Sequence, residues 1–196
     1  MKAGKNGITK NTPKNILFGA GTIHKGLKHE GGTWNFKESI VGATSGGSKL
    51  SIVPEITPVE VDGAQVAIKG LKVKTGETAA LEVNFIELSA ELVKSATVGT
   101  TDDENAVDGY DVIKSKSDIE EGDYWENIAF VGKTLEGKNI IVILDNAICT
   151  SGLELEGKNK EAGIGTFTFE CTADPNLDDE NDLDTLPWHI YYPTTA

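Results

Sequence analysis

Cysteine is scarce in this 196-residue sequence, which contains only Cys149 and Cys171. Two cysteines do not make the disulfide framework on which small secreted domains depend. Both lie in strand-like runs and neither has a histidine beside it in the chain, so each is expected to be a buried structural thiol. We therefore expect free thiols in a protein made in a cytosol.

Long apolar runs are also missing, and none approaches the roughly 20 residues that a membrane-spanning helix needs. The first 14 residues hold four lysines, without the apolar stretch that would follow them in a signal peptide. The sequence therefore predicts no membrane association.

Positive charge is in short supply: 18 Lys and Arg stand against 31 Asp and Glu, for a formal net charge of −13. A protein that reads a nucleic-acid sequence needs a basic face to neutralise phosphates, so this class is disfavoured. An acidic protein is nevertheless suited to lie near DNA without holding it, because like charges repel.

Motifs for catalysis and cofactor binding are absent as well. Residues 42–49 resemble a phosphate-binding loop, but Ser48 occupies the position of the lysine. Gly19 and Gly21 suggest a dinucleotide fingerprint, but His24 stands where the third glycine belongs. No G-x-S-x-G nucleophile elbow is present. We expect no enzyme activity and no cofactor.

Metal ligands do not gather at a recognisable spacing. His24 and His29 are not accompanied by the cysteine or acidic pairs of a zinc site. The acidic cluster 178–184 lacks the glycine of an EF-hand calcium loop, so a solvated acidic loop is the favoured interpretation. The sequence predicts no metal site.

The sequence does contain the pattern of a turn-rich β protein, with short apolar runs separated by many of its 22 glycines. Residues 59–75 alternate apolar and polar positions, and the dipeptides Asp62-Gly63 and Lys69-Gly70 interrupt them as turns. The predicted short strands here are 59–61, 65–68 and 71–75. A longer strand follows, with Leu81, Val83 and Phe85 on one face.

The period then changes to that of a short amphipathic helix over about 89–98. Ser89 is placed to cap this helix, and Gly99 suits its end. Its apolar stripe comprises Leu92, Val93 and Ala96. We expect the helix to cover a face or an edge of the sheet.

Further strands are predicted along the chain, and the one at 15–20 is expected to be buried. A bend is expected at 145–150, and 152–156 is expected to form a hairpin with 165–171. The other predicted strands are 34–36, 49–53, 110–117, 128–131, 139–144 and 187–192.

One domain is expected over residues 1–196. Its predicted appendages are a polar N-terminal arm at 1–14, a projecting hairpin at 45–62 and an acidic tail at 175–196. Pro54 and Pro58 cannot both lie in the middle of a central strand. We therefore expect a bent strand, or a pair of strands, that projects from the body around these prolines.

Several phrases, taken in order along the chain, resemble the major tail protein of long-tailed bacteriophages, which forms the tail tube. They are residues 42–47 (GATSGG) with 49–54, 59–63 with 68–70, 78–88 with 89–94, and 125–127, 130–132 and 137–147. The order of the phrases makes the resemblance specific, and it covers about 16–174. The segment after Pro175 matches no such pattern.

The resemblance implies a β-sandwich or partial barrel with a flanking helix. Six copies would form a ring whose inner strands join into one barrel, and rings would stack into a negatively lined tube through which DNA passes without specific binding. The partners would be further copies of the chain and the tape-measure, tail-terminator and distal-tail proteins. The protein would lie in the virion tail after synthesis in the cytoplasm of a bacterial host.

The residues themselves indicate the same kind of assembly. A β protein with long strands leaves open sheet edges, which pairing around a closed ring removes. Head-to-tail contacts along the ring axis do not close, so they give a filament. The predicted contact residues for self-assembly are Ile16, Leu17, Phe18, Leu50, Ile52, Ile56, Val59 and Val61.

Two alternatives stay open at this point. The first is the inner tube of a contractile tail or contractile particle. The second is a β-sandwich adhesin or carbohydrate-binding module, which the three tryptophans suggest. Trp34, Trp125 and Trp188 are better explained as core or interface anchors.

Overall fold

One antiparallel sheet of seven strands makes up most of the molecule, for which a computed structural model describes residues 5–157, 159–175 and 183–194. Its main path runs β1-β8-β9-β10-β5-β4, and β11 also pairs with β9. The strands are β1 (Leu17–His24), β4 (Thr44–Pro58), β5 (Lys72–Phe85), β8 (Tyr124–Thr134), β9 (Asn139–Cys149), β10 (Gly165–Cys171) and β11 (Trp188–Tyr191).

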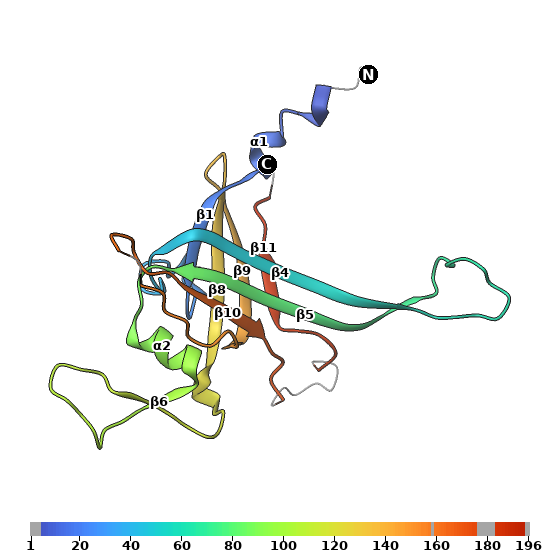
Figure 1. The fold of residues 1–196 in the computed structure, drawn as a ribbon. Helices are drawn as coiled ribbons and strands as arrows, with labels where there is room; N and C mark the ends of the chain where they lie inside the picture. Colours follow the sequence, from blue (N-terminus) through green and yellow to red (C-terminus); the bar gives the residue numbers. More distant parts are fainter. Residues whose placement is uncertain (1–4, 158, 176–182, 195–196) are drawn as a thin grey trace.

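The sheet curls on itself, because β8 and β9 run across the direction of β4 and β5 (Figure 1). One side of β9 pairs with β8, while its other side is shared between β10 and β11. β1 and β4, at the two ends of the path, approach within 8 Å between Cα atoms although the path does not pair them. The result is a half-open barrel, which confirms the predicted mainly β fold with one short helix.

The main core lies inside this curl. Ile128 and Phe130 of β8 and Leu144 of β9 point into it, opposite the inward-facing residues of β5 and β10. Those facing residues are Ala79, Leu81, Val83, Phe85, Phe167, Phe169 and Cys171. Burial of this apolar surface is the main favourable contribution to folding.

The helix α2 (Ala90–Thr97) covers one part of this core with Leu92 and Ala96. Ser89 caps it as predicted, since its hydroxyl accepts a hydrogen bond of 3.2 Å from the Leu92 N–H. The predicted end at Gly99 is one residue late, because Val98 takes the left-handed conformation that ends the helix.

Gly99 instead begins β6 (Gly99–Thr101), which pairs with β7 (Ile113–Ser115). A Cβ atom at Gly99 would lie 2.8 Å from the Cγ2 atom of Ile113. The glycine is therefore required by the close approach of β7. The described residues contain no helix that is long and apolar enough to cross a bilayer.

A smaller second core lies on the opposite face of β8 and β9, where Ala129, Val131, Ile141 and Ile143 point outward. The hairpin of β2 (His29–Glu30) and β3 (Thr33–Trp34) covers it, together with Leu27 and Phe36. Both faces of β8 and β9 are therefore buried, and these strands form the centre of the body.

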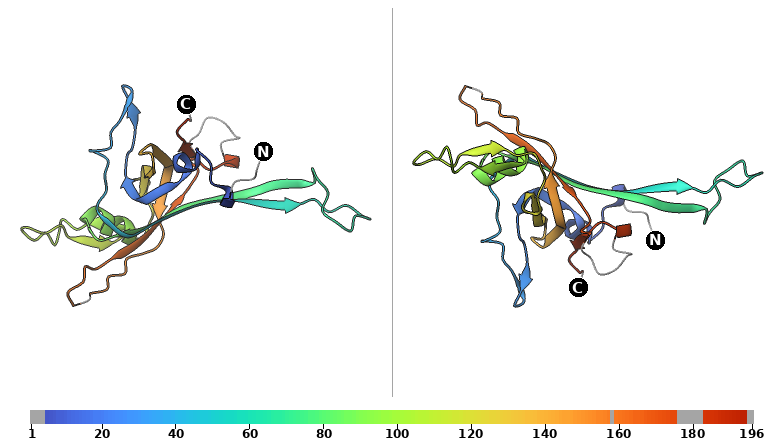
Figure 2. Two further views of the ribbon diagram at one scale, coloured as in Figure 1. Left: turned by 90° about the horizontal axis from the view of Figure 1, so that it is seen from above. Right: turned by 90° about the horizontal axis from the view of Figure 1, so that it is seen from below.

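The hairpin of β4 and β5 leaves the body and extends far beyond it (Figures 1 and 2). Residues 59–71 form its tip and have no strand, so the predicted strands at 59–61 and 65–68 are wrong. The two predicted turns are confirmed, because Ala64 N–H donates to the Val61 carbonyl and Leu71 N–H to the Ile68 carbonyl. Neither face of the tip is covered, so the alternation of apolar and polar residues at 59–71 does not mark a buried face.

The predicted loop at 42–49 and the predicted end at Pro54 are also wrong, because β4 starts at Thr44 and continues to Pro58. Pro54 is tolerated because β4 lies at the edge of the sheet, where one side of the strand has no partner strand within the described part of the chain. The prediction of a projecting strand around the two prolines is confirmed.

Three other sequence predictions need correction. The bend expected at 145–150 is absent from 145–149, where β9 continues to Cys149 and pairs with β8. Residues 152–156 form no strand, and β10 pairs with β5 and β9 instead. The strand expected to be buried at 15–20 is an exposed edge, β1, that begins at Leu17 and continues to His24.

The N-terminal arm is partly helical rather than without period. It contains the short helical turns η1 (Lys5–Gly7) and α1 (Thr12–Asn15), with Pro13 in the first turn of α1. Another helical turn, η2 (Glu121–Asp123), precedes β8. The predicted C-terminal edge strand is confirmed as β11, while residues 176–182 of the acidic tail lie outside the described part.

Candidate self-assembly surface

The most unusual surface is the outer part of the β4–β5 hairpin, residues 53–73, which we call the arm. Its exposed aliphatic residues are Val53, Ile56, Val59, Val61, Val66, Ile68 and Val73. Val66, at the tip, keeps 78% of its surface in solvent. Apolar residues gathered in this way on a projecting element mark an interaction surface.

The arm has few contacts of its own to hold it. The hydroxyls of Thr57 and Thr75 lie 3.0 Å apart across the two strands, and the Val59 N–H donates to the Leu71 carbonyl at 2.9 Å. A two-stranded ribbon with both faces in water is only marginally stable. A partner that covered the arm would therefore stabilise it.

The base of the arm, by contrast, is anchored to the body through Glu77. The carboxylate of Glu77 accepts hydrogen bonds from the Lys74 ammonium at 2.6 Å and from the Trp188 indole N–H at 2.8 Å. These two bonds hold the pKa of Glu77 below its usual value. The C-terminal strand β11 thus fixes the point at which the arm leaves the sheet.

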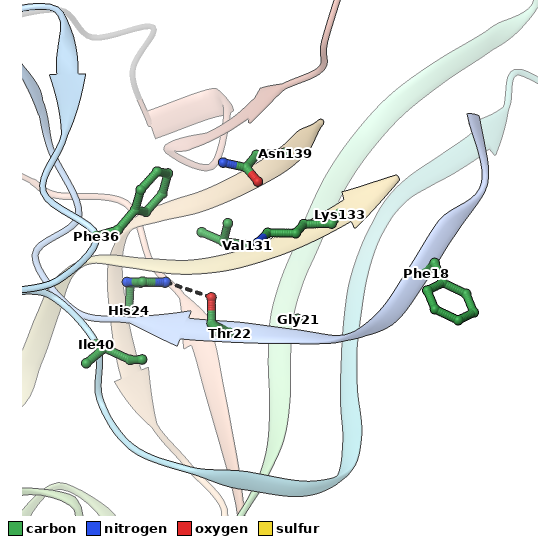
Figure 3. Close-up of a pocket in the computed structure, with 9 residues that line it drawn as sticks. All are labelled: Phe18, Gly21, Thr22, His24, Phe36, Ile40, Val131, Lys133 and Asn139. Atoms are coloured by element: carbon green, nitrogen blue, oxygen red, sulfur yellow. Dashed lines mark hydrogen bonds between the residues drawn. The ribbon is translucent and has the colours of Figure 1, made fainter. Parts of the chain in front are cut away.

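A second exposed apolar surface lies at the start of β1, where Ile16, Leu17 and Phe18 all face solvent. Phe18 is 69% exposed and borders a groove of about 390 Å³ (Figure 3). Phe36, Ile40 and Val131 make its apolar lining. The outer side of β1 is an open sheet edge, so unpaired backbone groups lie beside this groove.

His24, which also lines the groove, is held as a neutral ring. Ser39 Oγ donates its only hydrogen to the Asn35 carbonyl at 2.8 Å, so His24 Nδ1 donates to Ser39 Oγ at 2.9 Å. The hydroxyl of Thr22 then donates to His24 Nε2 at 2.8 Å (Figure 3). Burial lowers the pKa of His24, and the ring has a structural role.

The predicted contact residues separate into three places. Ile56, Val59 and Val61 lie on the arm, and Ile16, Leu17 and Phe18 lie at the exposed start of β1. Leu50 and Ile52 are half-buried and pack against the main core opposite Leu81 and Ala79. The structure therefore places six of the eight predicted residues on exposed apolar surfaces.

Sequence reasoning missed four arm residues: Val53, Val66, Ile68 and Val73. The alternating pattern at 59–75 contains three of them, but it predicts short strands rather than an uncovered tip. One feature of the sequence could have indicated the arm. No long apolar run occurs between Pro54 and Lys74, whereas a strand buried in the body contains more large apolar side chains.

The tryptophans do not form a flat platform for a sugar. Trp125 is buried and donates a hydrogen bond of 2.6 Å to Ser95 Oγ, while Trp188 is bonded to Glu77. Trp34 is half-buried, and its ring stands at 77° to that of Tyr191. These positions match the interpretation of tryptophan as a core or interface anchor.

Both cysteines are buried and free, as predicted. Burial raises the pKa of Cys171 to about 11, so this thiol is unreactive at neutral pH. Among the described residues, no group of three or more His, Cys, Asp or Glu is arranged to hold a metal ion. The acidic cluster 178–184 lies mostly outside the described part of the chain.

A scan against protein-family models found no matching family, and a search of curated proteins found no match to this chain.

Proposed function

We propose that this chain is a structural subunit that assembles with copies of itself into rings stacked as a tube, the tail tube of a long-tailed phage. The observation that supports this proposal is the arm, a projecting ribbon with seven exposed aliphatic residues and few contacts of its own. The ordered sequence phrases that resemble major tail proteins supply the phage assignment.

In a protein that works alone, the exposed apolar surface of the arm would be unfavourable in water. Burying one half-exposed Val or Ile side chain in an interface is favourable by roughly 1 kcal/mol. Seven such residues on one element are enough for a substantial contact with a neighbouring copy. A projecting apolar hairpin of this kind is also a risk for aggregation unless its partner is specified.

The open edges of β1 and β4 support a closed arrangement of copies. Within the described residues, the outer side of β4 and the outer side of β1 up to its bridge with Ile40 have backbone N–H and C=O groups without a ladder partner. Pairing the edge of one copy with that of the next removes both edges when the rotation closes. The proposed ring therefore continues the half-open barrel of one copy into its neighbours.

The net charge of −13 suits a conduit for DNA. An acidic wall repels the phosphate backbone, whereas lysines facing the lumen would bind phosphates and retard the passage of DNA. The proposed partners are further copies of the chain and the proteins that begin, measure and end the tail. The proposed location is the virion tail.

Electron microscopy of concentrated, purified protein tests the proposal. We expect rings or tubes from the wild-type chain and dispersed monomers from the double substitution Val66→Thr and Ile68→Thr, which makes the arm tip polar. Leu155→Thr with Ile164→Thr is the matched control, because both residues are exposed aliphatics outside the arm. A wild-type protein that stays monomeric at every concentration contradicts the proposal.

The tube of a contractile tail would use the same kind of arm, so this alternative needs a separate observation. A sheath protein that binds the outer wall of the assembled tube distinguishes the two forms. The geometry of the tryptophans described above gives no support to the carbohydrate-binding alternative.

A further inference from the structure

Charge is distributed unevenly along this acidic chain. Residues 1–24 contain four lysines and no acidic residue. Residues 100–123 contain nine acidic residues and two lysines, a net charge of −7 out of −13 for the whole chain. The two segments therefore have opposite charge within one molecule.

The fold places the described part of the first segment that precedes β1, residues 5–16, and the acidic segment at opposite ends of the central strands. The acidic segment ends where β8 begins at Tyr124, and β8 is 11 residues long. At the far end of β8, Thr134 pairs with Leu17, which follows the N-terminal arm. At about 3.3 Å per residue the two ends are roughly 35 Å apart. Figure 1 shows the N-terminal arm and the β8–β9 turn at one end, and the β6–β7 loop at the other.

Few of the acidic side chains are neutralised inside the molecule. Lys114 pairs with Asp102 at 3.0 Å, and Lys116 pairs with Asp123 at 2.6 Å and with Glu120 at 2.9 Å. Within the described part of the chain, the other acidic residues of this segment are exposed and form no ion pair. They are Asp103, Glu104, Asp108, Asp111, Asp118 and Glu121.

Exposed lysines at the opposite end likewise form no ion pair with the described residues. Lys10 and Lys133 are exposed and form no ion pair with any described residue, and the ammonium of Lys138 donates to the Thr194 carbonyl at 3.2 Å. We call residues 103–121 the acidic end, and residues 5–18 with 133–138, which also include the exposed Glu136, the lysine end.

Both ends also have exposed apolar residues among their charges. Tyr110 is 76% exposed at the acidic end, beside the exposed Val107 and Ile119. At the lysine end, Phe18 and Leu135 are exposed. An apolar centre with a charged rim is the usual arrangement of a protein–protein interface.

We propose that the acidic end of one copy docks on the lysine end of a second copy, head to tail along the direction of β8. The second copy is the occupant that the charges favour, because each end supplies the sign that the other lacks. Such a contact joins two different surfaces and does not close, so it extends as a filament. This inference rests on the proposed function and specifies the contact between successive rings.

The contact predicts a dependence on salt. Exposed charge pairs are screened over about 8 Å at physiological ionic strength and over about 3 Å at 1 M. Tubes formed at low salt are therefore expected to shorten as salt is added, while ring contacts that depend on the apolar arm persist. Growth of the tube with salt would argue against a contact based on opposite charges.

Charge exchange between the two ends is the decisive experiment. Lys10→Glu with Lys133→Glu removes most of the excess positive charge of the lysine end, and is expected to leave rings while lowering the fraction in long tubes about tenfold or more. Adding Asp103→Lys and Asp111→Lys in the same chain gives the acidic end two lysines that can pair with the new glutamates, and is expected to restore long tubes. Lys28→Glu with Lys37→Glu is the matched control, since these exposed lysines lie on the β2–β3 face.

Circular dichroism and thermal unfolding establish that every variant is folded before its assembly is compared. Tubes of wild-type length from the Lys10→Glu, Lys133→Glu variant overturn the inference and leave the proposed function intact. A fourfold variant that forms only rings overturns it as well. If the wild-type chain itself forms neither rings nor tubes, the proposed function fails and the contact between rings fails with it.

Discussion

The two halves of the β4–β5 hairpin are built from similar residues and have opposite surroundings. In the half within the body, Val83 and Phe85 of β5 are fully buried. In the arm half of the same strand, Val73 is 48% exposed, and Ile56 on the paired strand β4 is 58% exposed. The body half is complete within one chain, whereas the arm half has the side chains of a buried strand without the layer that would bury them.

If the proposed function holds, this difference separates the interactions that fold the chain from those that assemble its copies. The body has two cores, a capped helix and buried polar groups that mostly have partners. The arm has its base fixed by Glu77 and Trp188, and beyond that point little besides its own ladder. Substitutions in the body should therefore change stability, and substitutions in the arm should change association.

Removal of the arm tip is expected to have the largest effect on assembly. Replacing residues 59–71 with Asn-Gly joins Pro58 to Lys72, which already pair, through a two-residue hairpin turn. We expect complete loss of tubes, seen by electron microscopy, with a thermal midpoint within a few degrees of wild type. Tubes of normal length from the shortened chain would show that the tip is not a contact.

A matched pair of valines on β5 tests the comparison directly. Val83→Ala removes two methyl groups from the main core and should cost about 2–3 kcal/mol of unfolding free energy in urea. Val73→Ala on the arm should cost less than about 0.5 kcal/mol in the dispersed protein. Only Val73→Ala is expected to raise the protein concentration needed for assembly. Equal losses of stability from the two changes would remove the distinction between body and arm.

Removing a hydrogen bond is expected to show a smaller difference in stability between the body and the arm. Ser95→Ala leaves the buried Trp125 indole N–H without its acceptor, which should cost about 1–2 kcal/mol. Thr57→Ala breaks an exposed hydroxyl pair on the arm and should cost less than about 0.5 kcal/mol. Chemical denaturation of both variants measures the difference, and a larger loss from Thr57→Ala would reverse the interpretation.

The smallest expected effect is a dependence of stability on pH through His24. Burial lowers its pKa in the folded protein, so the unfolded chain binds a proton more readily below the usual 6.5. The contribution of His24 is therefore complete above that pH and is lost as the pH falls below it. His24→Gln should flatten the stability difference between about pH 7 and about pH 5.5. An unchanged pH profile in this variant would contradict the role assigned to the ring.

Much of the body could be predicted from the sequence, because its periodicity comes from burial within one chain. Leu81, Val83 and Phe85 alternate since one face of β5 meets the core, and the cap at Ser89 is local chemistry. The strand pairings could not be predicted. β10 pairs with β5, which is far from it in the sequence, and with the preceding strand β9, rather than with the segment at 152–156.

The errors in the candidate surface have one physical cause. An apolar run indicates that something covers it, but not whether the cover comes from the same chain. Residues 15–20 were predicted to be buried, yet Leu17 and Phe18 are exposed at a sheet edge. Leu50 and Ile52 were predicted as contacts, yet they pack against the core of their own chain.

Hydrogen exchange of the backbone amides in residues 53–73 tests the central claim most directly, by comparison of dispersed and assembled protein. We predict rapid exchange in the dispersed chain, because the arm has no covering layer, and strong protection on assembly, while amides of β8 and β9 are protected in both states. Equal exchange in the arm before and after assembly would contradict the claim that a neighbouring copy covers it.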